Sequence, residues 1–168
     1  MIVGNGDIAS VLKEVDRKDY IFFASGVSNS QEKRKSEYKR ELDLLLKQDK
    51  SKHLIYFSSL AIFYSDTPYT RHKRLMEKTI SVLWDHYTII RLGNITWGVN
   101  PHTIINFMKV KIVMGEKFPI RNVYRYVVSK EDFLHWINLI PDWNCEMNIP
   151  GERMSVKEIY AKINSHEL

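Results

Sequence analysis

The sequence predicts an α/β domain with a mainly parallel β-sheet. Two observations support this fold class. Short apolar runs typical of buried strands occur at 20–23, 54–57 and 87–90, and segments whose apolar residues recur at helical spacing lie between them. Alternation of strands and helices is the pattern of α/β proteins. A chain of 168 residues is large enough for one domain with one sizeable core.

The first element is a very short strand at 1–3, which runs into a glycine turn. The turn reads Gly4-Asn5-Gly6-Asp7-Ile8-Ala9, and the helix after it has an apolar face of Val11, Leu12 and Val15. Between a strand and a helix, a Gly-x-Gly-x-x-Ala turn lets the backbone approach a pyrophosphate. The alternative is a plain tight turn capped by Asp7. The Asp7 carboxylate would also repel a phosphate, although it complements the helix dipole.

The second predicted strand, at 20–23, ends at Ala24-Ser25-Gly26. A helix is expected from about Glu32 to Gln48, and its apolar face would carry Tyr38, Leu42, Leu45 and Leu46. Its opposite face is basic, with Lys33, Arg34, Lys35, Lys39 and Arg40. Charge on a surface helix is the ordinary arrangement, so we interpret this face as solvated.

The stretch after the third predicted strand, at 54–57, carries the strongest candidate chemistry. Two serines, Ser58 and Ser59, follow the strand, and Pro68 then opens a helix with apolar residues at Leu75, Met76, Ile80, Leu83 and Trp84. Tyr69 and Lys73 are four residues apart and therefore project from one face of that helix. A lysine ammonium there would lower the pKa of the tyrosine and make it a general acid or base near neutral pH. One chance match is expected in this composition, and Tyr126 with Lys130 is a second match across a strand end.

The remaining elements complete the alternation. A strand at 87–90 ends in Arg91-Leu92-Gly93-Asn94, and a short helix at 103–108 leads to an apolar segment at 110–114. A strand follows at 122–128, then a helix that starts at 129–132, and a short strand at 147–149. Ser155 and Glu158 form a capping box that opens the last helix.

Composition narrows the class of protein. The net charge is +5 and the pI about 9.2, which suits an anionic ligand such as a nucleotide but also nucleic acid. The single Cys145 excludes an internal disulfide and fits a reducing compartment, and we expect a cytoplasmic protein without a signal peptide or membrane span. The six histidines show no metal-ligand spacing, so no metal site is expected.

In this order, the motifs resemble the NAD-dependent epimerase/dehydratase family, the extended short-chain dehydrogenases. The similar stretches are the glycine turn at 4–9, 23–26, the serine motif at 56–59 with Tyr64, the helix start at 68–77, 91–98 and the tail at 147–158. The resemblance implies a truncated Rossmann-type sheet, mainly parallel with helices on both faces, as a single domain over 1–168. It also implies NAD or NADP as cofactor, a nucleotide-sugar or other small molecule as substrate, and a homodimer formed through helices 32–48 and 69–86.

The resemblance assigns roles to individual residues. Tyr69 would be the acid/base group, Lys73 its pKa-tuner and ribose ligand, Ser59 a substitute hydroxyl donor, and Asn94 a substrate ligand. The residues implied in cofactor binding are Gly4, Asn5, Gly6, Asp7, Ile8, Ala24, Ser25, Gly26, Ser58 and Lys73.

The sequence also departs from the family pattern. Only a dozen or so residues separate the first helix from the strand at Tyr20, where the family has two further strands with their helices. The charged residue that would read the adenosine ribose about 20 residues after the glycines is absent. The family's catalytic Ser or Thr position, four before Tyr64, is Leu60. The glycine turn is one residue short, and the loop from Leu60 to Tyr69 is also short.

Three functions are therefore compatible with the sequence. The first is an NAD(P)-dependent enzyme acting on a nucleotide-sugar. The second is a catalytically degenerate relative that serves as a nucleotide-binding or protein-interaction subunit. The third, a nucleic-acid binder, is disfavoured because no nucleic-acid motif accompanies the charge. Its candidate residues are Arg71, Lys73, Arg74, Arg121 and Arg125.

Overall fold

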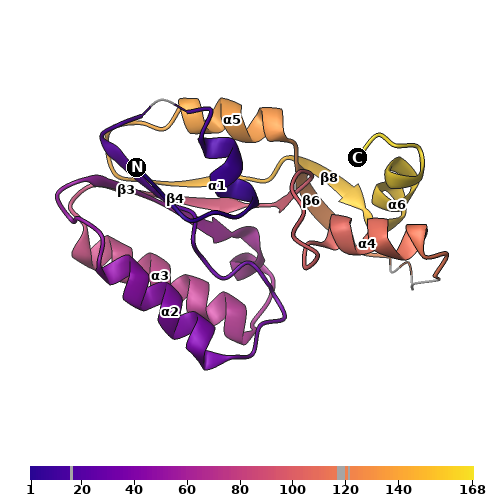
Figure 1. Cartoon of the computed structure of the whole chain (residues 1–168), viewed down its shortest axis with the longest axis horizontal. Helices are drawn as coiled ribbons and strands as arrows, with labels where there is room; N and C mark the ends of the chain where they lie inside the picture. The colour runs from indigo at the N-terminus through magenta and orange to yellow at the C-terminus, as the bar shows by residue number, and fades with distance from the viewer. Residues whose placement is uncertain (16, 117–119, 121) are drawn as a thin grey trace.

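The larger of two β-sheets forms the centre of the molecule. A computed structural model describes residues 1–15, 17–116, 120 and 122–168. The large sheet has five parallel strands in the order β1-β2-β3-β4-β7 (Figure 1). The strands are β1 (Ile2–Val3), β2 (Tyr20–Phe23), β3 (His53–Ser59), β4 (Tyr87–Leu92) and β7 (Cys145–Ile149).

This strand order confirms the truncated Rossmann-type sheet that the sequence predicts. In a complete Rossmann sheet the strand order is 3-2-1-4-5-6, so two further strands lie on the outer side of the first strand. In the described part of the chain, β1 pairs with β2 alone and forms the edge of the sheet. In the register of the sheet, Ile2 of β1 lies beside Phe22 of β2, and Phe57 of β3 lies beside Ile90 of β4.

Helices cover both faces of the large sheet, as expected. The helices α2 (Lys35–Leu46) and α3 (Pro68–Leu83) lie on one face, and α1 (Asp7–Leu12) and α5 (Lys130–Asn138) lie on the other (Figure 1). Alternate residues of each strand serve the two layers. In β2, Phe22 packs in the α1/α5 layer, whereas Ile21 and Phe23 pack in the α2/α3 layer.

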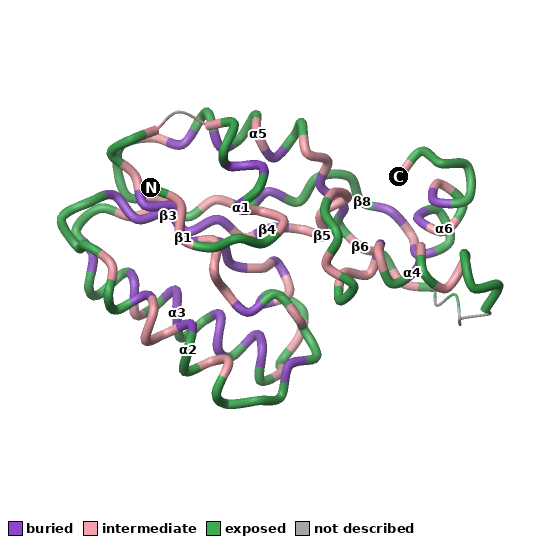
Figure 2. The backbone as a smooth tube through the Cα atoms, in the orientation of Figure 1, coloured by how far each residue is buried: buried purple, intermediate pink, exposed green. Residues whose placement is uncertain are grey.

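A smaller lobe adjoins the end of the large sheet. It contains β5 (Asn94–Ile95), β6 (Tyr124–Val128) and β8 (Glu152–Ser155), with α4 (Ile104–Val113) and α6 (Val156–Asn164). It has its own core, which includes Ile105, Met108 and Ile159, and Figure 2 shows these buried segments apart from those of the large lobe. Hereafter these elements are the small lobe, and the large sheet with α1, α2, α3 and α5 is the large lobe.

The structure corrects several details of the sequence-based prediction. The small sheet was not predicted, because β5 has two residues and β8 reads Glu-Arg-Met-Ser without an apolar run. The helix and apolar segment expected at 103–114 form one helix, α4. Three residues assigned to apolar helix faces are instead exposed: Leu46, Leu75 and Leu83. The capping box of Ser155 and Glu158 is present.

Within the described residues, no helix combines the length and apolarity needed to cross a bilayer.

Replacing Phe133 by Ala should lower the free energy of unfolding by about 3–5 kcal/mol. Phe133 is fully buried on α5 and packs against Phe57 and Trp97, with ring centroids 5.8 and 5.1 Å away. Urea denaturation measures the loss. The control is Leu139→Ala at the end of the same helix, where the side chain is 55% exposed and the expected loss is under about 0.5 kcal/mol. Equal effects for the two variants would contradict this packing.

Candidate functional site

The predicted site residues come from segments at one edge of the large sheet. Parallel strands end at the same edge, and α/β proteins bind ligands in the crevice outside those carboxyl ends. Here the edge receives the turn after β1, the loop after β2, the serines that end β3 and the segment after β4. The structure therefore brings together segments that lie as far apart as 4–8 and 93–100 in the sequence.

The glycine turn after β1 depends on a close approach between two backbones. Gly4 has φ +128°, and a Cβ on it would lie 2.5 Å from the carbonyl oxygen of Ala24. Only glycine fits there, so the turn rests directly on the loop after β2. A Cβ on Gly6 would meet nothing within 4 Å, which leaves the backbone there open to a ligand. Asn5 and Gly6 are exposed, and Ile8 packs against the core.

The carboxylate of Asp7 is engaged with another part of the chain. Its Oδ1 accepts from the backbone N–H of Val99 at 3.0 Å, and its Oδ2 accepts from that of Asn100 at 3.1 Å. The indole N–H of Trp97 donates to the Asp7 carbonyl at 3.1 Å. The sequence predicts either a helix-capping or a phosphate-repelling carboxylate at this position. The contacts with residues 97–100 could not be read from the sequence, because they join residues more than 85 positions apart.

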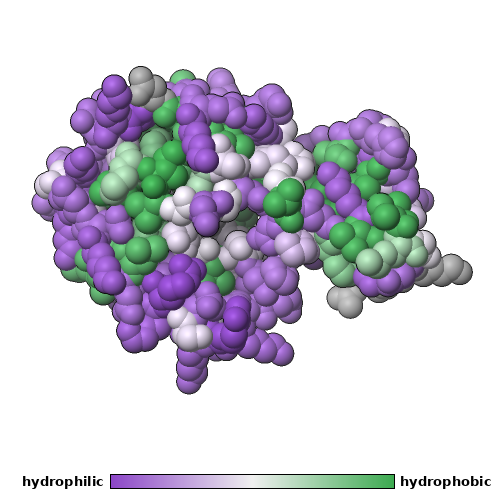
Figure 3. All heavy atoms as spheres, in the orientation of Figure 1, coloured by the Kyte–Doolittle hydropathy of each residue, from purple (hydrophilic) through white to green (hydrophobic). Residues whose placement is uncertain are grey.

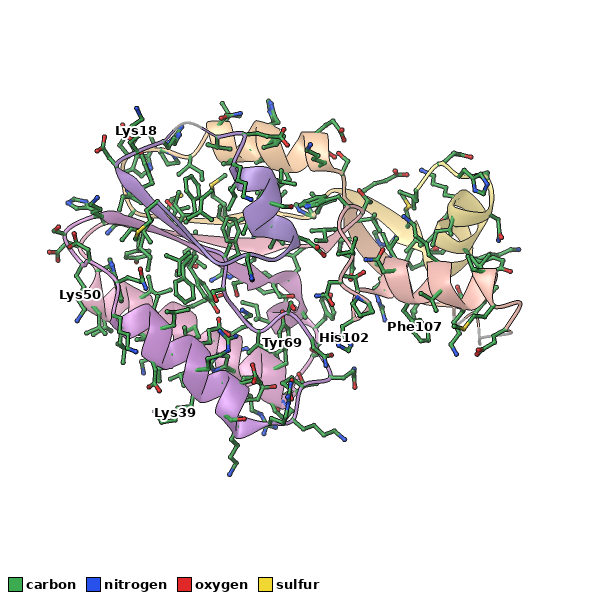
Figure 4. The ribbon with its side chains drawn as sticks, in the orientation of Figure 1. Lys18, Lys39, Lys50, Tyr69, His102 and Phe107 are labelled. Atoms are coloured by element: carbon green, nitrogen blue, oxygen red, sulfur yellow. The ribbon has the colours of Figure 1, made fainter. Side chains whose placement is uncertain are left out.

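Tyr69 and Lys73 lie side by side in the first turns of α3, as their spacing predicts. A capping box of Thr67 and Thr70, with Pro68 as the first residue of the helix, fixes the start of α3 next to the end of β3. The ammonium nitrogen of Lys73 is 5.8 Å from the ring centroid of Tyr69. Tyr69 is 8% exposed and Lys73 2%. Figure 4 shows Tyr69 at the end of α3 that is nearer the small lobe.

Lys73 is held by a buried carboxylate that the sequence analysis did not single out. Its Nζ lies 3.1 Å from Oε1 of Glu41, on α2, and donates to the hydroxyl of Tyr56 at 3.0 Å. Glu41 is fully buried and also accepts from Tyr56 OH at 2.7 Å and from the Val27 N–H at 2.7 Å. Its Oε2 lies 3.0 Å from Nε2 of His72. This set of residues, Tyr56, Glu41, His72 and Lys73, is the buried polar cluster.

A sequence signal for Glu41 exists. It occupies the apolar stripe of α2 between Tyr38 and Leu45, three and four residues away, where a glutamate predicts a buried partner of opposite charge.

The cluster sets the charge states of its members. Burial raises the pKa of Glu41, but the Lys73 charge and the hydrogen bonds from His72, Val27 and Tyr56 outweigh burial and lower the pKa to about 2. Burial, followed by the nearby Glu41 charge, raises the pKa of Tyr56 well above its ordinary value. Tyr56 therefore stays a neutral hydrogen-bond donor, and Glu41 stays a carboxylate at neutral pH.

The buried polar cluster also explains Gly26. A Cβ at this position would lie 2.7 Å from Nζ of Lys73 and 2.8 Å from Oε1 of Glu41. Gly26 and Val27 thus sit directly on the cluster, and Arg40 of α2 donates to the carbonyl of Ser25 at 3.2 Å. The loop after β2, which includes the predicted cofactor contacts Ala24, Ser25 and Gly26, is tied to α2 and α3.

The two serines after β3 have partners within the protein. Ser58 is buried and donates to the carboxylate of Glu77, which is paired with Arg91 at 2.7 Å. Ser59 caps the 3-10 helix η1 (Leu60–Phe63), where its hydroxyl accepts from the Ala61 N–H at 3.2 Å. Leu60, at the position where the resemblance expects Ser or Thr, is 6% exposed and supplies no hydroxyl.

Asn94 lies at the junction of the two lobes. Its Nδ2 donates to the carbonyl of Tyr126 at 2.9 Å, and its backbone pairs with Val127 of the small sheet. The side chain is partly exposed. A substrate bound by Asn94, as the sequence predicts, would therefore lie between the large sheet and the small lobe.

The basic side chains that the sequence offers as nucleic-acid contacts are largely buried or engaged in ion pairs and hydrogen bonds within the protein. Arg71 and Arg74 both pair with Asp66, at 2.7 and 3.5 Å, and Lys73 is buried. Arg125 donates to the carbonyl of Tyr124 at 2.9 Å, and Arg121 lies outside the described residues. Among the described residues, no group of three or more His, Cys, Asp or Glu side chains is arranged to hold a metal ion.

Open hollows lie away from this edge. One is lined by residues of α2, among them Lys39, Arg40 and Asp43, and a second lies at the opposite edge of the sheet beside Tyr20, His53 and Asp142. Neither includes a predicted site residue. We base the site on the carboxyl edge, because both hollows are shallow and the ligand crevice of a parallel sheet lies at that edge.

Solved structures with a similar fold include two 4-epimerases and an enzyme in complex with NAD and UDP. The UDP-glucose 4-epimerase of the hyperthermophile Thermotoga maritima, with UDP-glucose, matches with a TM-score of 0.70 and 15% identity, covering 88% of this chain and 60% of that chain. WbmG of Bordetella bronchiseptica, in complex with NAD and UDP, matches with 0.66 and 16%, covering 88% and 56%. The UDP-N-acetylglucosamine 4-epimerase of Methanobrevibacter ruminantium M1, in complex with UDP-N-acetylmuramic acid, matches with 0.66 and 18%, covering 92% and 62%.

These matches show a shared Rossmann-type fold. This chain spans no more than 62% of the length of these three structures. No family model matches the sequence, and no curated protein matches it.

Replacing Glu41 by Gln should lower the free energy of unfolding by about 3–5 kcal/mol at pH 7, because it leaves the Lys73 ammonium buried without a counter-ion. The folded-state pKa of Glu41 is lowered, so its stabilisation is fully present above the ordinary carboxyl pKa of 4.5 and declines as the pH falls toward about 2. Chemical denaturation of wild type and variant at several pH values measures the gap between their free energies of unfolding.

The matched control is Glu37→Gln on the same helix, which removes a partly exposed pair with Arg40. Its expected cost is under about 1 kcal/mol. A gap for Glu41→Gln that matches this control, or that stays constant between neutral and acidic pH, would contradict the assignment.

Proposed function

We propose that this chain binds NAD or NADP and a nucleotide-sugar at the carboxyl edge of the large sheet, and that it is an epimerase/dehydratase-like protein with Tyr-Lys acid/base chemistry. The observation that carries the proposal is the placement of Tyr69 beside Lys73, 5.8 Å from ring centroid to ammonium, at the edge where a Rossmann-type fold binds its ligands. The solved structures that share this fold include complexes with NAD and UDP and with UDP-glucose.

The residues of the glycine turn fit one side of a dinucleotide. Gly4 brings the turn against Ala24, and the open space beside Gly6 allows a phosphate to reach the backbone. The helix that follows, α1, has six residues, so its dipole adds little. The edge position of β1 leaves the adenosine side with fewer protein contacts than a complete Rossmann sheet offers. We therefore propose weakened binding of either nicotinamide cofactor.

In the proposed mechanism, the bound nicotinamide supplies the hydride chemistry. Tyr69 gives or takes the proton at the sugar oxygen, and the Lys73 charge stabilises negative charge on the Tyr69 oxygen during transfer. Lys73 would also be the residue that holds the cofactor ribose, and Ser59 would be the available hydroxyl donor. Asn94, at the junction of the lobes, would bind the substrate.

A second candidate function is a catalytically degenerate relative that binds a nucleotide or another protein subunit. Two observations favour it. Leu60 places an apolar side chain where a hydroxyl would polarise the carbonyl, and Glu41 compensates the Lys73 charge at 3.1 Å. Both reduce the stabilisation available for charge that develops in a transition state.

We also propose a homodimer in which α2 and α3 of two copies form a four-helix layer. Their outward faces carry Val82 at 72%, Leu75 at 51% and Leu46 at 43% exposure. Exposed apolar side chains on adjacent helices fit an isologous contact between copies. Sedimentation velocity at increasing concentration tests this proposal. A cytoplasmic location, which is inferred from the free Cys145, remains a prediction.

Calorimetric titration with NAD+, NADH, NADP+ and NADPH should give a Kd of about 100 μM or tighter for at least one of them, which is about 5.5 kcal/mol of binding free energy. Gly6→Ala should fold normally, since its Cβ has open space, but should weaken binding at least tenfold, about 1.4 kcal/mol, by obstructing the phosphate. The absence of binding up to millimolar cofactor would refute the cofactor proposal. Unchanged affinity in Gly6→Ala would remove the turn from the site.

Tyr69→Phe should abolish turnover of a nucleotide-sugar, because no other group would transfer the proton, and should leave cofactor affinity within about threefold. Leu60→Thr is the complementary variant. A wild type without turnover that gains activity on Leu60→Thr identifies the degenerate relative, whereas turnover in wild type identifies the enzyme. Full activity of Tyr69→Phe would exclude the proposed acid/base role. Spectrophotometric detection of NADH, with product analysis, measures both.

A further inference from the structure

The two lobes are joined by a narrow neck. The chain crosses this neck three times: at Gly93 between β4 and β5, at Ser129 between β6 and α5, and at Pro150 and Gly151 between β7 and β8. The first and last crossings touch, because the Gly93 N–H donates to the Ile149 carbonyl at 3.0 Å and a Cβ on Gly93 would lie 2.7 Å from the Pro150 carbonyl oxygen. Gly151 has φ +65° and leaves no room for a Cβ, which would lie 2.1 Å from the Val127 carbonyl oxygen. Figure 3 shows the small lobe standing out from the large lobe beyond this neck.

A hydrogen-bonded connection between the lobes lies away from the neck and runs through Asp7. Both oxygens of this carboxylate accept backbone N–H groups, from Val99 and Asn100, in the segment between β5 and α4. Gly98 has φ +91°, and a Cβ there would lie 2.0 Å from Cγ of Asp7. The glycine is therefore required both for the backbone angle and for the approach of the carboxylate.

The segment that Asp7 holds is tied to the rest of the site and to α4. Asn100 donates from Nδ2 to the hydroxyl of Ser28, in the loop after β2, at 2.9 Å. Asn106, in the first turns of α4, donates to the carbonyls of Asn100 at 2.9 Å and Gly98 at 3.2 Å. The Trp97 ring packs on Phe133 of α5, at 5.1 Å between centroids. A movement of the segment 97–100 would therefore also move α4.

We propose that Asp7 is a positioning residue whose carboxylate latches the segment 97–100, and with it the small lobe, against the carboxyl edge of the large sheet. Charge-assisted hydrogen bonds to two successive N–H groups are stronger than neutral ones. They act away from the neck, so they oppose rotation of the small lobe about it. Asn94 belongs to the small lobe and lies three residues before Trp97, so the latch fixes the substrate side of the proposed crevice.

This inference rests on the proposed function only for its consequence for ligands. Removing the latch frees the segment 97–100 and lets the small lobe, which carries Asn94 on β5, move relative to the large sheet, so nucleotide-sugar binding weakens. It also removes a negative charge beside the glycine turn, so binding of an anionic dinucleotide tightens. A residue with a merely structural role would weaken both.

Hydrogen exchange of the backbone amides, followed by NMR without any ligand, tests the latch itself. In Asp7→Ala the amides of Val99 and Asn100 should exchange at least about tenfold faster, whereas the Thr96 amide, which donates to the Val128 carbonyl in the small sheet, should be unaffected. Asp7→Asn retains one acceptor oxygen and should keep one of the two amides protected. Asp43→Asn, which removes an exposed carboxylate from α2, is the matched control.

Gly98→Ala is a second variant that tests the same contact, because its Cβ would collide with the carboxylate of Asp7. Alone it should speed exchange of both amides about tenfold, and in the Asp7→Ala background it should add less than about threefold, because the two changes break one interaction. Unchanged exchange in Asp7→Ala, or additive effects in the double variant, would overturn the latch.

Titration of Asp7→Ala separates the latch from the proposed function. We expect UDP-glucose binding to weaken about tenfold and NAD+ binding to tighten severalfold relative to wild type, as the charge argument requires. Parallel weakening of both ligands would overturn the positioning role. If wild type binds neither ligand, the proposed function fails, and the exchange measurements alone decide on the latch.

Discussion

The buried ion pair between Glu41 and Lys73 is the interaction on which the rest of the site depends. One carboxylate joins α2 to α3 through Lys73, to β3 through Tyr56, and to the loop after β2 through the Val27 N–H. A buried ammonium is tolerated only with such a partner, so the position of Lys73 is set from outside its own helix. The same contact neutralises the charge that would assist Tyr69. Packing therefore requires Lys73 to be neutralised, whereas the proposed acid/base chemistry requires its charge to act on Tyr69.

The truncation of the sheet changes what surrounds the glycine turn. In a complete Rossmann sheet the first strand is central, whereas here β1 has two residues and forms the edge. Very short edge strands offer little backbone to a foreign strand, which protects the protein from edge-to-edge association. The turn therefore lacks the two outer strands of a complete Rossmann sheet as neighbours, and it contacts the segment 97–100 through Asp7.

Sequence patterns predicted the large lobe well because its elements are governed by local periodicity. Buried parallel strands such as β2 and β3 read as apolar runs, and the capping box of Ser155 marks the start of α6. In the small sheet, the strand expected at 122–128 is present as β6, but β5 and β8 were missed because they are short or polar and are defined by their partners. In the site, the four-residue spacing placed Tyr69 beside Lys73, but the partners of Lys73 and Asp7 come from other elements. Pairing across elements depends on tertiary structure, which a local pattern does not contain.

The two lobes are interleaved along the chain, and this arrangement constrains the order of assembly. The large sheet takes its first four strands from residues 2–92, but its last strand, β7, follows the small-lobe elements β5, α4 and β6. Thr88 thus finds its partner Cys145 only after most of the small lobe has been synthesised. Closing such a long loop slows folding, because its entropic cost precedes the gain from pairing. During translation, the open side of β4 is therefore exposed until β7 emerges, and this interval is the period of greatest exposure to misassociation.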